Sequence, residues 1–169
     1  PAAGVKGAMA TAALETAGVN KTSVNRLIFL PQTNINIWGK PYLKIDVVRS
    51  ADMNRTPDMR TRAYLPNWCA EVEIRFATPN FSARSISSLV KNAGQLIGLG
   101  DFRQEKGRGS FGTFSIAGEE LGEYQELWDE LMQEGREVQE LARDNPECAD
   151  QETAELMQFL QEERLRRAA

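Results

Sequence analysis

Residues 70–76 read Ala-Glu-Val-Glu-Ile-Arg-Phe and form the clearest strand pattern in the chain. Apolar side chains at Val72, Ile74 and Phe76 alternate with charged ones, which is the period of a strand that is buried on one face. We therefore expect a strand that ends at Pro79 and Asn80.

A helix, a loop and a second strand are expected after it. Ser82 is a suitable N-cap, and apolar residues recur at helical spacing through residues 86–93. A glycine-rich stretch follows, and residues 113–116 predict a last strand with Phe114 in the core. Strand, helix, loop and strand make a split βαβ-like unit, typical of ferredoxin-like folds. The expected fold class is therefore α+β with a ferredoxin-like core.

The residues before this unit are expected to add a helix and further strands. Good helix formers predict a helix over residues 2–17, and apolar runs predict strands at 27–30, 35–38 and 44–49. Residues 50–62 are polar and contain a proline, so we expect an exposed insertion loop. This loop carries Arg55, Arg60 and Arg62.

From Glu119 onward the pattern changes to acidic helices. An apolar stripe at roughly helical spacing runs among glutamates, and Asn145-Pro146 breaks it. Asp150 is a candidate cap for a second helix, whose last turns carry basic residues that favour a helix C-terminus.

The charge distribution divides the chain at the same place. Residues 1–117 carry 15 basic and 8 acidic side chains, a net charge of +7, whereas residues 118–169 carry 5 and 16, a net charge of −11. We expect a basic body over 1–117 and an acidic helical tail over 118–169, with a nucleic-acid partner for the body. Two parts that dock on each other electrostatically would explain the same distribution.

Composition excludes several classes of protein. The chain has no histidine, so Ser-His and Cys-His nucleophiles are impossible, and we expect no catalytic residue, metal ion or cofactor. Two isolated cysteines, Cys69 and Cys148, indicate a reducing compartment such as the cytoplasm. No stretch has the roughly 20 apolar residues of a membrane span. The sequence begins at Pro1 and not at methionine, which fits a fragment of a longer polypeptide.

The glycine-rich stretch, residues 98–114, is the leading candidate for a binding site. Glycine lets a backbone approach a ligand closely, cations neutralise phosphates, and aromatic rings stack on bases. A hairpin-like connection whose phenylalanines fill the core is the alternative. The candidate residues are Gly98, Gly100, Gly107, Gly109 and Gly112, with Phe102, Phe111, Arg103, Lys106 and Arg108 between them.

The arginine-bearing insertion is the second candidate. Arg55, Arg60 and Arg62 fit a finger that crosses a nucleic-acid strand, and a solvated loop explains them almost as well. We add Lys6 to the phosphate-contacting residues of the body.

Two sets of short motifs resemble known families. Residues 1–8, Pro-Ala-Ala-Gly-Val-Lys-Gly-Ala, resemble a helix-start motif of the RAMP superfamily, the RNA-binding subunits that form the backbone of CRISPR effector complexes. Residues 98–100 with 107–112 resemble that superfamily's C-terminal glycine-rich loop. A family of phage and prophage proteins of unassigned function is also similar, at Leu65-Pro-Asn-Trp68, the strand of residues 71–76, Asn92-Ala-Gly94 and residues 98–103, although Gln104 replaces its usual proline.

The resemblance covers residues 1–116 and leaves the acidic tail without a counterpart. It implies an RRM-like core that binds single-stranded RNA or DNA along its backbone, without catalysis, in the cytoplasm of a bacterial host. It also implies self-assembly into a homo-oligomer, or a place as a subunit of a nucleoprotein complex. The alternative is a module that docks on, or inhibits, a host CRISPR-type complex through its body or its acidic tail.

Overall fold

The computed structural model describes residues 1–49, 55–106, 109–118 and 122–168. The chain is α+β and divides into two compact units that interleave along the sequence. The first unit is Pro1–Asn36 with Ala70–Glu126, and the second is Ile37–Cys69 with Leu127–Ala169. This grouping differs from the expected division at 117/118. Residues 37–69 precede that boundary, yet they contact the C-terminal helices that follow it.

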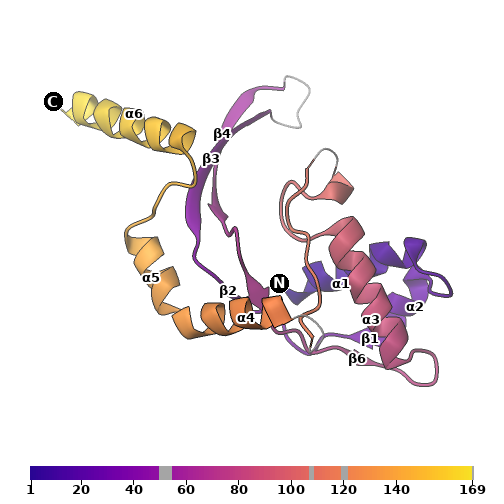
Figure 1. Cartoon of the computed structure of the whole chain (residues 1–169). Helices are drawn as coiled ribbons and strands as arrows, with labels where there is room; N and C mark the ends of the chain where they lie inside the picture. Colours follow the sequence, from indigo (N-terminus) through magenta and orange to yellow (C-terminus); the bar gives the residue numbers. More distant parts are fainter. Residues whose placement is uncertain (50–54, 107–108, 119–121, 169) are drawn as a thin grey trace. The chain divides into compact units, whose positions relative to one another are not determined.

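The first unit consists mainly of helices (Figure 1). The expected N-terminal helix is present as an α-helix continued by a 3-10 turn, and the expected helix after Ser82 is present and continues into a π-helical turn. The elements are α1 (Ala2–Ala12), η1 (Ala13–Glu15), α2 (Lys21–Leu27), β1 (Ile28–Phe29), β6 (Arg75–Phe76), α3 (Ala83–Asn92), η2 (Ala93–Ile97) and η3 (Gln104–Lys106).

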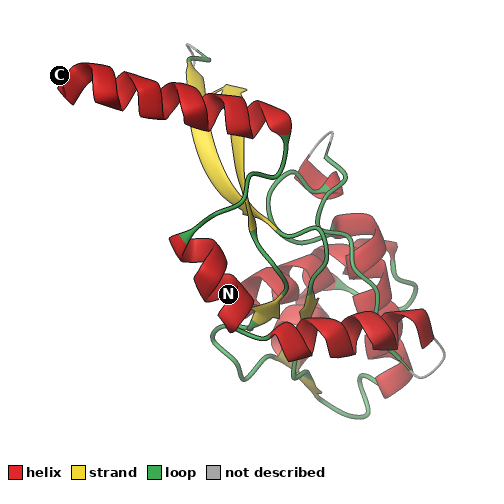
Figure 2. Cartoon of the chain, turned by 60° about the vertical axis from the view of Figure 1, so that its left-hand side comes forward, coloured by secondary structure: helices red, strands yellow, loops and turns green. Residues whose placement is uncertain are grey.

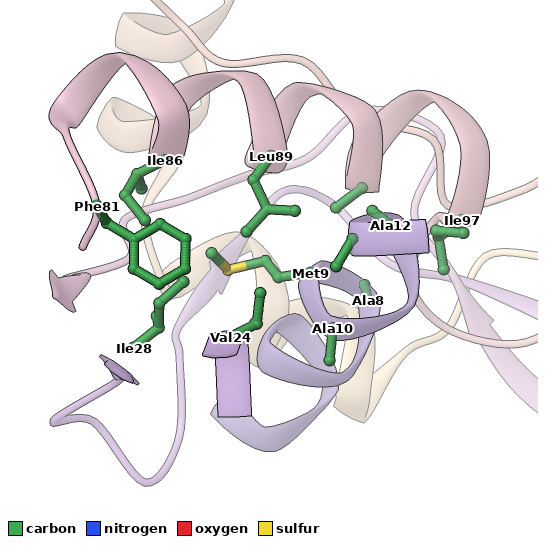
Figure 3. Close-up of a cluster of buried hydrophobic side chains, with 12 residues drawn as sticks. Ala8, Met9, Ala10, Ala12, Val24, Ile28, Phe81, Ile86, Leu89 and Ile97 are labelled. Carbon is green, nitrogen blue, oxygen red and sulfur yellow. The ribbon is translucent and has the colours of Figure 1, made fainter. Parts of the chain in front are cut away.

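The core of the first unit lies between α1, α2 and α3 (Figure 3). Met9, Val24 and Leu89 are completely buried there, and the small side chains of α1 let the helices approach closely. Ser82 caps α3 as expected: its hydroxyl accepts the Ser85 backbone N–H at 3.2 Å, while the Ser85 hydroxyl accepts the Ser82 N–H at 2.9 Å. This capping box fixes where α3 begins.

The strand expected at residues 70–76 forms only in part. The burial alternates as predicted, and Ile74 and Phe76 pack against the core. Backbone pairing with β1, however, involves only β6. At Glu71 and Glu73, which precede β6, the side-chain amide of Gln32 takes the place of a partner strand. It donates to the Glu71 carbonyl at 3.4 Å and accepts the Glu73 N–H at 3.0 Å.

Of two further strand predictions for this unit, one is confirmed in part and one is wrong. Within residues 27–30, Ile28 and Phe29 form the two-residue β1, whereas Leu27 ends α2, whose N-cap Asn20 accepts the Ser23 N–H at 2.8 Å. Residues 113–116 form no strand, because the Phe114 N–H donates to the Gly94 carbonyl of η2 at 3.2 Å and not to a neighbouring strand. Phe114 does pack against the core, as predicted.

The second unit is built on an antiparallel hairpin of β3 (Tyr42–Arg49) and β4 (Pro57–Tyr64). β3 contains the strand expected at 44–49, but the exposed loop expected over 50–62 is wrong for residues 57–62, which form most of β4. Residues 50–54 lie outside the described part. The polar sequence of β4 concealed the strand, and its charges are compensated across the hairpin, where Arg62 pairs with Asp46 at 2.9 Å.

Three helices follow where two were expected, because the first expected helix is divided at Gly135, which has a φ of +59°. They are α4 (Gly122–Glu134), whose residues from Leu127 belong to this unit, α5 (Glu137–Asp144) and α6 (Gln151–Ala168). Asp150 caps α6 as predicted, since its carboxylate accepts the Thr153 N–H at 2.8 Å. A short pair of β2 (Ile37–Trp38) and β5 (Cys69–Ala70) completes the strands, so the described strands form three two-stranded sheets.

Residues 147–153 hold α6 against β3 (Figure 2). Leu43 donates its N–H to the Glu147 carbonyl at 2.7 Å and accepts the Ala149 N–H at 2.8 Å. The buried Thr153 hydroxyl accepts the Ile45 N–H at 3.2 Å. These bonds satisfy the outer edge of β3, which would otherwise leave unpaired backbone groups.

Ion pairs reinforce this contact. Lys40 pairs with Glu147 at 2.7 Å, and Lys44 pairs with Asp150 at 2.6 Å. The hydrogen bond from Lys44, together with those from Thr153, holds the pKa of Asp150 well below its ordinary value. Electrostatic docking, the alternative explanation of the charge distribution, therefore describes this part of the acidic tail.

Neither cysteine is in a disulfide: Cys69 and Cys148 are free thiols. Among the described residues, no helix combines the length and the apolar character needed to cross a bilayer.

We expect Leu89→Ala to destabilise the first unit by about 2–5 kcal/mol, because it leaves a cavity between α1 and α3. Leu14→Ala is the matched control, since Leu14 is 71% exposed and should change stability by less than about 0.5 kcal/mol. Urea denaturation measures both. Equal effects of the two substitutions would contradict this core.

The contact of α6 with β3 should depend on acid through Asp150. A carboxylate whose pKa is lowered in the folded state contributes stability above its unfolded pKa and loses it as the pH falls. Denaturation of the wild type at pH 7 and at about pH 3 should therefore show a loss that is smaller in Asp150→Asn. Asp144→Asn, at an exposed carboxylate, is the control and should keep the wild-type loss. An unchanged loss in Asp150→Asn would refute the role of this pair.

Candidate functional site

Residues 98–114, the glycine loop, close on themselves through backbone contacts within the first unit. The Leu99 N–H donates to the Gly112 carbonyl at 2.8 Å, and the Phe111 N–H donates to the Phe102 carbonyl at 3.3 Å. The two arms of the loop thus run beside each other, beyond the end of α3 and η2 (Figure 1).

Two of the predicted glycines are needed for this closure. A Cβ on Gly112 would overlap the Leu99 carbonyl, and one on Gly109 would overlap the Phe102 carbonyl. Gly112 also has a φ of +72°, a conformation that other residues adopt at a cost. Glycine is therefore used here for the approach of one arm to the other, a role that the sequence alone did not distinguish from approach to a ligand.

The closed loop presents Phe102 and Phe111 to solvent. Their side chains are 63% and 43% exposed, and their ring centres lie 5.8 Å apart with the planes inclined at 45°. Phe102 also has a φ of +56°, which costs about 1–3 kcal/mol for a bulky residue. The fold therefore bears backbone strain at a residue whose ring contributes little to the core.

The cations of the loop are placed unequally. Arg103 is half-buried: its guanidinium bonds to the Glu105 carboxylate at 2.8 Å and to the Gly100 carbonyl at 2.9 Å. These bonds fix its plane and partly neutralise its charge. Gly107 and Arg108 lie outside the described residues, as does the side chain of Lys106, although its backbone belongs to η3.

Gly98 and Gly100 have positive φ at the start of the loop.

Lys6 lies elsewhere in the first unit. Its ammonium donates to the Asn25 carbonyl at 3.0 Å and lies 5.8 Å from the ring centre of Phe29. Sequence reasoning missed Phe29, because it falls in an apolar run; the ring is nevertheless 55% exposed. Within the two-residue strand β1, Ile28 is buried and the next residue, Phe29, is exposed, so the apolar run itself does not indicate which of its residues faces solvent.

The three arginines of the insertion belong to the second unit, whereas the glycine loop belongs to the first. Arg60 pairs with Asp58 at 3.1 Å, and Arg62 pairs with Asp46 in the cross-strand contact of the hairpin. Arg55 is exposed just before β4, with a φ of +46°. Two of these three predicted phosphate contacts thus have carboxylate partners.

Comparison of the chain with protein-family models, with curated proteins and with solved structures finds no match.

Gly112→Ala should open the glycine loop, since the added methyl group meets the Leu99 carbonyl. Hydrogen exchange of the Leu99 amide, which donates to residue 112, should become faster. Gly100→Ala is the matched control: Gly100 has a φ of +82°, but an added Cβ meets no other atom within 4 Å. Equal exchange rates in the two variants would show that close approach is not what glycine provides at 112.

Proposed function

We propose that the chain binds single-stranded nucleic acid without catalysis, and that the glycine loop is its principal contact. The observation that carries this proposal is the exposed pair of Phe102 and Phe111, held by backbone bonds on a strained loop. A single exposed ring is ordinary on a protein surface, but here two neighbouring rings face solvent.

Stacking on bases suits this arrangement. Exposed aromatic rings bind bases of any sequence, because every base has a π-face, and each stacked base contributes about 1–3 kcal/mol. Duplex bases are stacked on each other, so the rings favour a single strand. Two rings inclined at 45° suit an unstacked strand better than parallel, stacked bases.

The charge of the loop supports a modest electrostatic contribution. Residues 98–114 carry three basic and two acidic side chains. We assign Arg103, Lys106 and Arg108 to phosphate contact, and Arg103 is also bonded to Glu105. With two or three phosphate contacts, the logarithm of affinity should fall with the logarithm of salt concentration with a slope of about −1.4 to −2.

Other features of the proposal rest on the resemblance and on sequence patterns. These are the RAMP-like and ferredoxin-like core, the phage or prophage origin, self-assembly along the strand, and a place in the bacterial cytoplasm. A ferredoxin-like core would require the described two-stranded sheets to be parts of one larger sheet. The binding proposal does not depend on these features.

The alternative, docking on a host nucleoprotein complex through the acidic tail, has less support. Glu147 and Asp150 are engaged with Lys40 and Lys44 of the same unit, so these carboxylates already have cationic partners. We therefore keep this alternative as an outcome of the binding experiment and not as a second proposal.

The double substitution Phe102→Leu and Phe111→Leu should weaken binding of a single-stranded oligonucleotide at least about tenfold, because leucine keeps the apolar contact but offers no π-face. The salt slope should stay unchanged. Lys106→Gln with Arg108→Gln should instead flatten the slope by about 1.4. Fluorescence anisotropy with single-stranded RNA, single-stranded DNA and duplex probes, each over a salt series, measures both effects.

Leu14→Ala serves as the control for loss of an exposed apolar side chain in the same unit, and it should bind as the wild type does. Full affinity of the double leucine variant would contradict the proposal, as would preference for the duplex. Binding of none of the probes by the wild type would leave docking on a protein complex as the better explanation.

A further inference from the structure

We infer that Phe29 is a second stacking position, where a nucleotide of the same single strand binds. Phe29 lies on β1, with Ile28 completely buried beside it, yet its own ring is 55% exposed. Single exposed apolar residues are ordinary on protein surfaces, so exposure alone carries no argument. The groups placed around this ring do carry one.

A lysine ammonium is held over the ring. Lys6 on α1 lies 5.8 Å from the ring centre, within the range of a cation–π interaction. The ammonium also donates to the Asn25 carbonyl of α2 at 3.0 Å. These partners are a neutral carbonyl and a ring, neither of which cancels its charge, so an ordered cation lies beside an exposed aromatic surface.

A second cation lies across the strand pair. Arg75 on β6 is directly opposite Phe29 in the antiparallel register, and side chains at opposite positions share a face of the sheet. It pairs with Glu73 at 2.7 Å, but both side chains are more than half exposed, so solvent screens the pair and a phosphate can compete for the arginine. An aromatic ring with one cation over it and another at the opposite position of the strand pair matches the base and the phosphates of a nucleotide.

The glycine loop follows the C-terminal end of α3 and η2, whereas β6, the partner of β1, precedes α3. β6 leads through Ser82 into α3, and the loop begins where η2 ends (Figure 1). The 15 residues of α3 and η2 span about 22 Å at 1.5 Å per residue. At about 3.4 Å per nucleotide, a strand that reaches both positions needs about six or seven nucleotides, and it needs fewer where it is unstacked and extended.

This separation makes the test depend on length. The inference rests on the proposed function, because the glycine loop has to bind the other part of the strand. An oligothymidylate of about three nucleotides reaches one position only, whereas one of about twelve reaches both. We expect Phe29→Leu to weaken the twelve-nucleotide complex about tenfold and to leave the three-nucleotide complex at the glycine loop unchanged. Matched oligouridylates repeat the comparison for RNA.

Two controls accompany it. Phe29→Tyr keeps an aromatic ring and should bind the long oligonucleotide as the wild type does, and Leu14→Ala reports the loss of an exposed apolar side chain elsewhere in the unit. Anisotropy measures the long complexes, NMR titration the short ones, and thermal unfolding checks that each variant is folded.

Wild-type affinity of Phe29→Leu for the long oligonucleotide would overturn the inference while leaving the glycine loop as the binding site. An equal loss with both lengths would also overturn it, since Phe29 would then act through the fold. If the double leucine variant of the glycine loop keeps its affinity for the short oligonucleotide, the proposed function fails instead, and the two failures are thereby distinguished.

Discussion

The packing of α1 against α3 is the constraint on which the first unit depends. Met9 and Leu89 meet without exposed surface, and the alanines of α1 bring the two helix axes close together. This contact holds α3 and η2 in place, with β6 before them and the glycine loop after them. Both aromatic positions therefore owe their placement to side chains that contact no ligand.

The glycine loop shows how a flexible sequence becomes a defined surface. Its backbone closes on itself at Gly109 and Gly112, where only glycine leaves room for a carbonyl of the opposite arm. The closure leaves Phe102 strained and exposed, which folding alone does not favour. A ligand that covers the ring would recover part of the hydrophobic free energy that the fold gives up there.

The sequence predicted elements whose signals are local and missed those that depend on a partner. Ser82 and Asp150 were identifiable as helix caps, because each acts on residues of its own turn. The sequence of β4 is polar and begins at a proline, which is typical of a loop, and it forms a strand because its backbone pairs with β3 along its whole length. The exposure of Phe29 and the contacts of Lys6 could likewise not be predicted from the sequence. Both depend on the packing of α1 against α2 and β1.

Stacking of bases on the paired rings is the central claim, and aromatic proton NMR tests it most directly. A stacked base shields the protons of the ring beneath it, so titration with a single-stranded oligonucleotide should shift the Phe102 and Phe111 ring resonances upfield, in proportion to the bound fraction. Binding that leaves both sets of resonances in place, with changes only at surface cations, would contradict the account.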